Sequence, residues 1–363
     1  MNHARRLRAL RAQMKQREIE ALLLTHLPDV RYFTGFTGSN AVVAVTARRA
    51  VLYTDGRYTV QAKEQVKVAR VIIAAHSALR EACNLLESLG VGGVAFDPEQ
   101  TTVSTLHLMR SALKYGRRRR NFFRPLDRPL PLLLRLVKDE DELRIMEKAA
   151  LEGCRLFEEL LPYIESGMAE TAVAARLEFA ARTLGAEGMS FETIVASGPR
   201  SALPHGHATS ALLPRNGFVT LDFGIILDGY CSDMTRTVFM GTPNRRQRFA
   251  YDAVLDAQLA AVEAVRPGAT CGEVDEAARS VLRKAGLAEH FTHSTGHGVG
   301  LEIHEAPRIA AGQAVELVPG MVITIEPGIY IAGKFGIRIE DMVAVTRQGG
   351  KVLTPATKAL LQL

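Results

Sequence analysis

The segment that most constrains the fold is an alternating run of residues with an Asp-Gly pair near its middle. It covers residues 218–240, FVTLDFGIILDGYCSDMTRTVFM, and the pair stands at 228–229. Asp-Gly between two apolar runs is a strong signal for a two-residue β-hairpin turn. Pairing about this turn places Asp222 opposite Thr235 and directs Asp222 and Asp233 to the same side, on a diagonal of roughly 7 Å. Two carboxylates at that separation repel each other unless a proton or a cation lies between them.

A second hairpin carries a second pair of acids. Residues 321–342 read MVITIEPGIYIAGKFGIRIEDM, and a short loop centred on Gly333 puts Glu326 directly opposite Glu340. A bulge in either strand would shift this register. Two predicted helices precede each hairpin, which indicates a loose internal duplication without a close sequence repeat.

The stretch between the hairpins is rich in histidine and glycine. Residues 293–307 read HSTGHGVGLEIHEAP, and the glycines on both sides of His297 let the backbone pass close to a site. Four carboxylates and one imidazole form a set of hard oxygen ligands with a single nitrogen, and four negative charges balance two divalent cations. Two such ions roughly 3.5–4 Å apart can hold a bridging hydroxide and polarise a carbonyl group. The alternative is that each acid is an ordinary solvated residue, with Asp233 paired to Arg236, and that each histidine is structural.

The length of 363 residues suggests two domains. Residues 1–130 alternate between helical and strand patterns, which predicts an α/β domain. The patterns predict helices at 5–19 and 77–89 and strands at 41–45, 50–53, 71–75 and 91–96. Three prolines within 125–131 exclude a helix there and indicate a linker, assigned to 131–138. The run KDEDE at 138–142 then starts a long helix, and residues 139–363 form a second, larger domain.

Charge and cysteine usage limit the class of protein. Lys and Arg number 45 against 39 Asp and Glu, a net charge of +6, and residues 114–128 alone hold seven basic residues and one acid. This run is compatible with a nucleic-acid patch or with a solvated loop, and the lack of a recognisable binding module favours the loop. The four cysteines are widely spaced without a CxxC pair, which excludes a disulfide scaffold and fits a reducing cytoplasm. No apolar run reaches the roughly 20 residues that span a bilayer, so we expect a cytoplasmic protein without a membrane segment.

Four motifs of the second domain resemble those of the metallopeptidase family with the pita-bread fold: LDFGIILDGYCSDMTRT, HSTGHGVGLEIHE, ITIEPGIY and GIRIED. Their order and spacing match the family throughout that domain. The family includes Xaa-Pro aminopeptidases, Xaa-Pro dipeptidases (prolidases), methionine aminopeptidases and the metal-free creatinases. The resemblance implies an α+β protein with a C-terminal pita-bread catalytic domain of the creatinase/aminopeptidase type and a smaller N-terminal α/β domain of the creatinase type.

The resemblance also implies a role for each matching residue. Five residues would be the metal ligands: Asp222, Asp233, His297, Glu326 and Glu340. Of these, Asp233 and Glu340 would bridge two divalent ions, and Glu326 would act as acid and base on the bridging water. The substrate side would comprise His205, His293, His304 and Arg338, of which His205 and His304 would contact the substrate and help stabilise the tetrahedral intermediate. Manganese or cobalt is the family expectation, and the ligand set is also compatible with zinc.

Without the resemblance, two of these roles have simpler interpretations. His205 lies between Pro204 and Gly206, which mark a turn, so it is compatible with an ordinary imidazole on a loop. Arg338 is compatible with a salt bridge inside the strand pair, for example to Asp341. Both alternatives assign these residues to structure rather than to catalysis.

The first domain separates the branches of the family. Methionine aminopeptidases usually lack an α/β domain of this size, and creatinases lack the metal ligands. The motifs VRYFTGFTGSNA and VLYTDGRYTVQA resemble the N-terminal domain of short bacterial aminopeptidase P-like enzymes, in which this domain helps to form dimers and narrows the site to short peptides with proline second. We therefore expect a homodimeric Xaa-Pro peptidase, and the choice between dipeptides and longer peptides stays open. The rivals are a non-enzymatic pita-bread protein that binds nucleic acid through residues 114–128, and an aminopeptidase or amidinohydrolase-like enzyme of other specificity.

Overall fold

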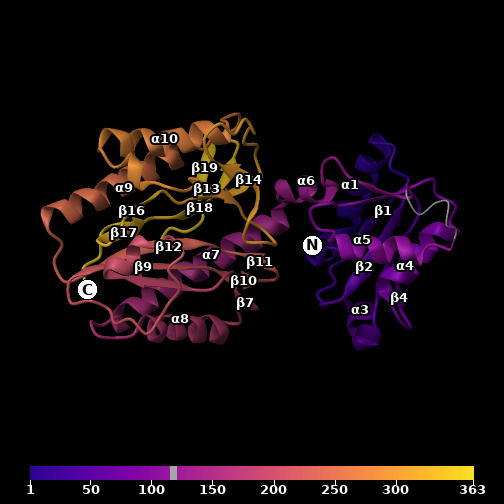
Figure 1. Ribbon diagram of the computed structural model, residues 1–363, viewed down its shortest axis with the longest axis horizontal. Coiled ribbons are helices and arrows are strands. Elements are labelled where there is room, and N and C mark those ends of the chain that lie inside the picture. The colour runs from indigo at the N-terminus through magenta and orange to yellow at the C-terminus, as the bar shows by residue number, and fades with distance from the viewer. Residues whose placement is uncertain (115–120) are drawn as a thin grey trace. The chain divides into compact units, whose positions relative to one another are not determined.

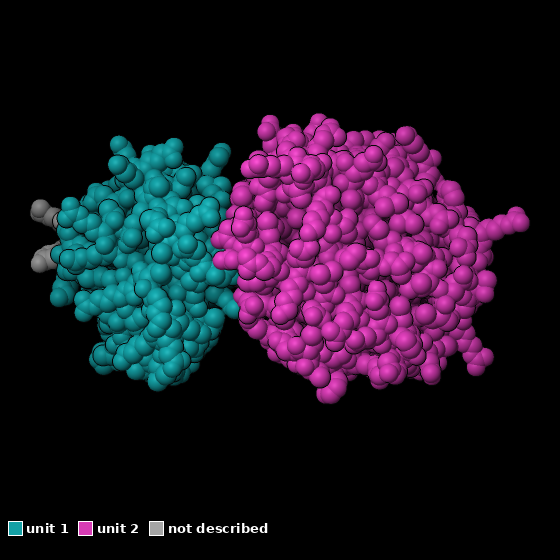
Figure 2. All heavy atoms as spheres, turned by 180° about the vertical axis from the view of Figure 1, so that it is seen from behind, with its two compact units in different colours: residues 1–135 teal, residues 136–363 magenta. Residues whose placement is uncertain are grey.

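The computed structural model describes residues 1–114 and 121–363, which form two compact units (Figure 2). Unit 1 comprises residues 1–135 and unit 2 comprises residues 136–363. The arginine run at 117–120, on which the nucleic-acid alternative depends, lies outside the described residues. Each unit has hydrophobic clusters of its own, and no helix in the described part of the chain is long and apolar enough to cross a membrane.

Unit 1 is built on one six-stranded sheet of mixed direction, with the strand order β4-β3-β2-β1-β5-β6. Its strands are β1 (Ala21–Leu24), β2 (Ala41–Thr46), β3 (Ala50–Thr54), β4 (Arg70–Ile73), β5 (Val94–Phe96) and β6 (Phe123–Pro125). Its helices include α1 (His3–Gln16), α2 (Leu27–Thr34), α3 (Thr59–Gln65), α4 (Ala78–Ser88) and α5 (Val103–Ala112). Ser77 caps α4 by accepting a hydrogen bond from the Arg80 backbone. Each predicted strand and helix is present, although β5 is shorter than the predicted 91–96 and other elements, such as α2 and α5, were not predicted. The α/β prediction for this part of the chain is confirmed.

The boundary between the units falls at the end of a helix that the sequence analysis did not predict. The helix α6 (Leu130–Leu136) occupies most of the stretch 131–138 that we expected to be a linker. Pro131 is the second residue of this helix, where its missing N–H group removes no intrahelical hydrogen bond, so the expectation that prolines exclude a helix there is wrong. In the last turn, Arg135 donates to the Asp29 carboxylate at 2.8 Å, and both side chains are buried. This ion pair ties α6 to unit 1.

Unit 2 repeats one order of elements, two helices followed by a hairpin. Its strands are β7 (Gly188–Met189), β8 (Ile194–Ser197), β9 (Gly217–Phe223), β10 (Ile225–Leu227), β11 (Tyr230–Cys231), β12 (Met234–Met240), β13 (Gly296–Gly298), β14 (Glu305–Ile309), β15 (Val322–Ile325), β16 (Gly328–Ile331), β17 (Phe335–Arg338), β18 (Asp341–Thr346) and β19 (Gly349–Val352). The helices α7 (Glu140–Leu160) and α8 (Glu170–Leu184) precede the hairpin of β9 to β12, and α9 (Arg245–Ala264) and α10 (Cys271–Lys284) precede that of β15 to β18. The helix α7 begins where the acidic run predicted it, with Asp139 and Glu142 forming a capping box.

The helices of unit 2 cover the outer faces of its strands (Figure 1). α7 and α8 pack on β9 and β12 through a buried cluster that includes Phe157 and Leu221. α9 and α10 pack on β15 and β18 through a second buried cluster that includes Val254 and Ile323. Because successive side chains of a strand point to opposite faces, the residues that alternate with these apolar positions face away from the helices.

The register of both hairpins agrees with the sequence-based prediction. Asp222 of β9 lies opposite Thr235 of β12. In the second hairpin, the β15–β18 ladder and the β16–β17 ladder share one register, and Glu326 and Glu340 hold opposite positions between the two ladders. The bulge that would have shifted this register is absent from both ladders. Each hairpin therefore presents its two acids as predicted.

Candidate metal centre

Four acidic side chains of the two hairpins line one pocket of unit 2. Asp222 is on β9, Asp233 directly precedes β12, Glu326 directly follows β15, and Glu340 directly precedes β18. The pocket has a volume of about 500 Å³. Asp222, Asp233 and Glu340 are only 7%, 4% and 2% exposed. Because buried carboxylates need a compensating charge, this cluster is a candidate cation site.

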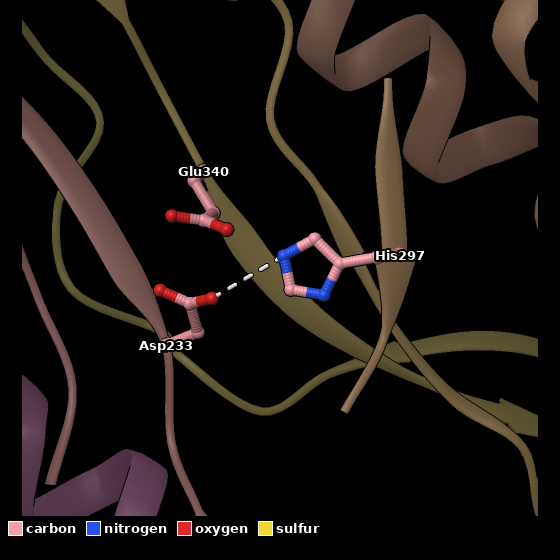
Figure 3. Close-up of side chains that lie close together, drawn as sticks. All are labelled: Asp233, His297 and Glu340. Carbon is pink, nitrogen blue, oxygen red and sulfur yellow. Dashed lines mark ion pairs between the residues drawn. The ribbon is translucent and has the colours of Figure 1, made fainter. Parts of the chain in front are cut away.

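His297 approaches the acids from β13 (Figure 3). One potential ligand atom each of Asp233, His297 and Glu340 lies within 4.8 Å of the other two. His297 Nε2 lies 3.6 Å from Asp233 Oδ2 and 3.4 Å from Glu326 Oε1. These separations exceed those of well-formed hydrogen bonds, so the groups converge without bonding to one another. Imidazole and carboxylate groups that converge in this way suit a divalent cation.

Burial and mutual repulsion disfavour the ionised form of the acids. Burial, followed by the charges of neighbouring carboxylates, raises the pKa of Asp233 and of Glu340 well above the ordinary range. Burial also raises the pKa of Glu326 to about 8. In the described part of the chain, Asp222 Oδ1 is buried without a hydrogen-bond partner. A divalent cation would supply both a positive charge for the acids and a partner for this oxygen, so the residues present fit a metal site.

Local backbone geometry orients His297. Its Nδ1 lies 3.0 Å from the Gly298 carbonyl oxygen, so Nδ1–H donates there and Nε2 carries the lone pair that faces the acids. Burial lowers the pKa of His297, which keeps the imidazole neutral. A Cβ atom at Gly296 would lie 1.9 Å from the Thr324 backbone oxygen, and one at Gly298 would lie 2.0 Å from that of Ala306. The glycines on both sides of His297 therefore leave room for the backbone of neighbouring segments.

Two threonine hydroxyls position the acids. Thr235 Oγ1 donates to Glu340 Oε2 at 2.8 Å, and Thr324 Oγ1 donates to Glu326 Oε1 at 3.3 Å. Neither threonine was assigned a role from the sequence. Strand alternation is the signal that would have found them, because Thr235 lies opposite Asp222 and Thr324 lies two residues before Glu326 on the same strand face.

The arginine that follows Asp233 does not neutralise it. Arg236 is buried and donates to Asp341 Oδ1 at 2.8 Å and to the Thr354 carbonyl oxygen at 3.0 Å. It also donates to the carbonyl oxygen of Glu340, so it fixes the backbone that carries this acid. The alternative that pairs Asp233 with Arg236 is therefore wrong.

Arg338 pairs with an acid of the cluster rather than with Asp341. Its guanidinium donates to Asp222 Oδ2, to the Tyr330 hydroxyl at 2.6 Å and to Thr235 Oγ1 at 3.2 Å. Burial opposes the charged form of Arg338, but Tyr330 and Asp222 outweigh it and raise its pKa above the ordinary range. The salt bridge to Asp341 is thus excluded as its role. Tyr330, which lies in the ITIEPGIY motif, is a contact that the sequence analysis missed.

Three further histidines line the same pocket, so all nine residues assigned to the site from the sequence meet there. The ring centroid of His304 lies 4.4 Å from that of His297, and partial burial lowers the pKa of His304. His293 Nε2 lies 2.9 Å from the Tyr330 hydroxyl, and burial is the main cause that lowers the pKa of His293 to about 4. His205 lies on the predicted turn and also lines the pocket. Its interpretation as a loop residue is therefore compatible with its interpretation as a residue that contacts the substrate.

Arg308 of β14, which was not singled out from the sequence, adds a cation to the pocket. It lies opposite His297 in the β13–β14 ladder and is exposed. No described residue forms an ion pair or a hydrogen bond with its side chain. Phe191 and Ile194 contribute an apolar wall. The pocket can therefore bind cations through its acids, a carboxylate through Arg308 and an apolar ring against its wall.

Comparisons with known proteins agree along the whole chain. The profile described as "Metallopeptidase family M24" matches residues 144–347, and that described as "Creatinase/Prolidase N-terminal domain" matches residues 6–122. The Xaa-Pro dipeptidase of Pyrococcus furiosus is 37% identical over 98% of this chain and 99% of its own. Among solved structures, the Xaa-Pro dipeptidase from Bacillus anthracis has a TM-score of 0.94 at 39% identity and covers 100% of both chains. The X-Pro aminopeptidase from Thermotoga maritima MSB8 has a TM-score of 0.86 at 36% identity, over 95% of this chain and 97% of its own.

Proposed function

The chain belongs to metallopeptidase family M24, and we propose that it is a dinuclear-metal exopeptidase that hydrolyses the bond between an N-terminal residue and a following proline. The observation that carries this proposal is the convergence of four acids and one imidazole in a single pocket. Relatives named as Xaa-Pro dipeptidases and as an X-Pro aminopeptidase support the specificity for proline. The proline nitrogen of such a bond carries no hydrogen, so peptidases that bind this group as a donor act poorly on it.

Five residues would hold the two ions: Asp222, Asp233, His297, Glu326 and Glu340. Asp233 and Glu340 would bridge the ions. When bound, the ions would activate a water molecule at neutral pH and polarise the scissile carbonyl group. We propose manganese or cobalt from the family resemblance, and the oxygen-rich set with one imidazole also suits zinc.

The side chains of the pocket would move the protons of the reaction. Glu326 would take a proton from the attacking water at its carboxylate and deliver it to the proline nitrogen as the bond breaks. His304 is neutral near pH 7 because partial burial lowers its pKa, so its N–H group would donate to the carbonyl oxygen without adding net charge. His205 would contact the substrate beside it, and Arg338 would hold Asp222 in place through their ion pair.

We propose further that dipeptides are the preferred substrates. In a dipeptide with proline second, a carboxylate directly follows the proline ring, whereas a longer peptide has a neutral amide there. The exposed guanidinium of Arg308 would bind this carboxylate, and charge-assisted hydrogen bonds of this kind are among the stronger ones. Phe191 and Ile194 would contact the ring.

A substrate panel tests the proposed specificity. The chelated enzyme would be reloaded with Mn²⁺, Co²⁺ or Zn²⁺ and assayed on Xaa-Pro dipeptides, Xaa-Pro tripeptides and Met-Ala peptides. We expect hydrolysis of the proline peptides only after metal is restored, and faster hydrolysis of the dipeptides. A preference for Met-Ala would identify an aminopeptidase of other specificity. Binding of metal without hydrolysis of any peptide would instead favour a non-enzymatic role. The presence of all five ligand residues argues against that role.

We also propose that the protein is a homodimer in the cytoplasm. The family resemblance supports the dimer, and the four cysteines are free and buried, which fits a reducing compartment. Light scattering on the purified protein should give the mass of two chains. The mass of one chain would contradict the dimer and leave the peptidase proposal intact.

A further inference from the structure

Unit 1 carries an excess of positive charge that the peptidase proposal does not use. It holds 23 of the 45 Lys and Arg residues but 10 of the 39 Asp and Glu residues, a balance of +13, so unit 2 balances at −7. Residues 114–128 account for +6 of that excess. The other +7 of unit 1 lies outside the basic run that the sequence analysis singled out.

Part of this charge surrounds one hollow of unit 1. Five basic residues line it: Arg11, Arg48, Arg49, Lys67 and Arg70. The rest of the lining is aliphatic, and among the described residues no Asp or Glu contributes to it. The hollow has a volume of about 650 Å³, within the range of about 300–1,000 Å³ that small-molecule sites occupy. It is therefore large enough for a ligand and lined by one sign of charge.

The turn between β2 and β3 and the strand β4 hold the backbone of three of these cations, Arg48, Arg49 and Arg70, in place. The turn between β2 and β3 is closed by a hydrogen bond from Thr46 N to Arg49 O at 2.8 Å and by one from Arg49 N to Thr46 Oγ1 at 3.0 Å. Arg70, the first residue of β4, pairs with Val51 of β3 in the parallel ladder. Because these positions are fixed without a ligand, binding would order only the side chains, which lowers its entropic cost.

The protein does not neutralise these charges itself. Arg48, Arg49 and Arg70 are exposed, and no residue in the described part of the chain forms an ion pair with them. The other two cations donate to backbone carbonyl oxygens at 3.0 Å, which leaves their charge uncompensated. Like charges gathered around one hollow raise its potential, so an anion placed among them is attracted by all five.

We propose that this basic hollow binds a small oligophosphate, a ligand with two or three linked phosphate groups. Four of the five cations are arginines, whose planar guanidinium donates two parallel hydrogen bonds to phosphate oxygens. A short phosphate chain carries several negative charges in a small volume, which matches the number of cations and the size of the hollow. The site is separate from the acid-lined pocket of unit 2 and shares no residue with it.

Calorimetric titration of the full-length protein with inorganic tripolyphosphate tests this site. The double variant Arg48→Gln/Arg70→Gln removes two exposed cations of the hollow, and Arg57→Gln/Arg80→Gln removes two exposed arginines of unit 1 that do not line it. We expect the first variant to bind tripolyphosphate at least about tenfold more weakly and the control to bind within about twofold of wild type. Both variants should keep wild-type activity on Xaa-Pro dipeptides. Thermal unfolding provides a second readout, because the ligand should raise the Tm of the control but not that of the hollow variant.

Three results would overturn the proposal. Equal affinity of the hollow variant and wild type would exclude the hollow as the site. Loss of binding only after neutralisation of residues 117–120 would assign the phosphate to that run instead. Tighter binding of a single-stranded RNA or of a poly-glutamate peptide, compared at equal charge concentration, would show that the hollow serves a macromolecule rather than a small oligophosphate.

Discussion

Without metal, the protein should become less stable as the pH rises from about 4.5 to about 8. Burial raises the pKa of Glu326 from its ordinary 4.5 to about 8, so between these values the folded state keeps a proton that the unfolded state has released. The free energy of unfolding therefore falls by about 1.4 kcal/mol per pH unit for this group alone, or by about 5 kcal/mol across the window. Below the window both states hold the proton, and above it both have lost it.

The other acids of the cluster act in the same direction. Burial also raises the pKa of Asp233 and of Glu340, so their titration adds to the loss of stability. A bound divalent cation favours the ionised acids in the folded state and reverses this effect. Adding Mn²⁺ to the chelated protein at neutral pH should therefore raise its stability and remove most of the pH dependence.

Urea denaturation of the chelated protein between about pH 5 and about pH 8 measures this effect. Glu326→Gln removes one titrating group and also removes a charge that raises the pKa of Glu340, so it should reduce the slope. Glu316→Gln, at an exposed position of unit 2, is the matched control and should leave the slope unchanged. If the stability of the chelated wild type stays constant or increases over this range, the reasoning about the buried acids is refuted.

Three further predictions concern single residues around the acids and the pocket. Thr235→Val removes the hydroxyl that donates to Glu340, so the affinity for Mn²⁺ should fall about 10- to 100-fold in a metal titration. Unchanged affinity would contradict the positioning role of Thr235. Gly298→Ala brings a Cβ atom within 2.0 Å of a backbone oxygen and should lower the Tm and abolish metal binding, whereas Gly56→Ala, where nothing lies within 4 Å, should do neither. Arg308→Gln should raise KM for Xaa-Pro dipeptides about tenfold with little change in kcat and leave tripeptides unaffected; equal effects on both substrates would argue against its contact with the carboxylate.

The hairpins and their acids were predictable from sequence because local signals determine them. The Asp-Gly pair at 228–229 sets the register of the first hairpin, and this register places Asp222 opposite Thr235. Strand alternation then determines which residues share a face. In the second hairpin, a short loop centred on Gly333 predicted Glu326 opposite Glu340, and the structure agrees with the placements in both hairpins.

The contacts that support the acids were not predictable by these rules, because they join residues far apart in the chain. Arg236 and Asp341 are separated by 105 positions, and Arg338 and Asp222 by 116. Which arginine pairs with which acid depends on how the two halves of unit 2 pack. From the sequence alone, Arg236 could equally pair with the nearby Asp233, and Arg338 with the nearby Asp341. The helix α6 was missed for a different reason, since a proline that interrupts a helix interior is harmless in the first turn.

The distribution of charge also needed the structure. The sequence located the net charge of +6 in residues 114–128, because the other residues sum to zero. The division into two units shows why these other residues sum to zero. The net charge of +7 in the rest of unit 1 cancels the net charge of −7 in unit 2. The acids around the pocket of unit 2 contribute to one side of this balance and the basic hollow of unit 1 to the other.

The most direct test of the proposed dinuclear peptidase is the metal content and the activity of the same samples. Wild type and Asp233→Asn would be chelated, reloaded with Mn²⁺, and assayed for bound metal per chain and for hydrolysis of an Xaa-Pro dipeptide. Asp233 lies among the buried acids beside His297, so replacing its carboxylate by an amide removes a charge that the proposed bridging position requires. We predict two ions and full activity for wild type, and fewer ions with little or no hydrolysis for the variant. Two ions and undiminished hydrolysis in Asp233→Asn would contradict the account.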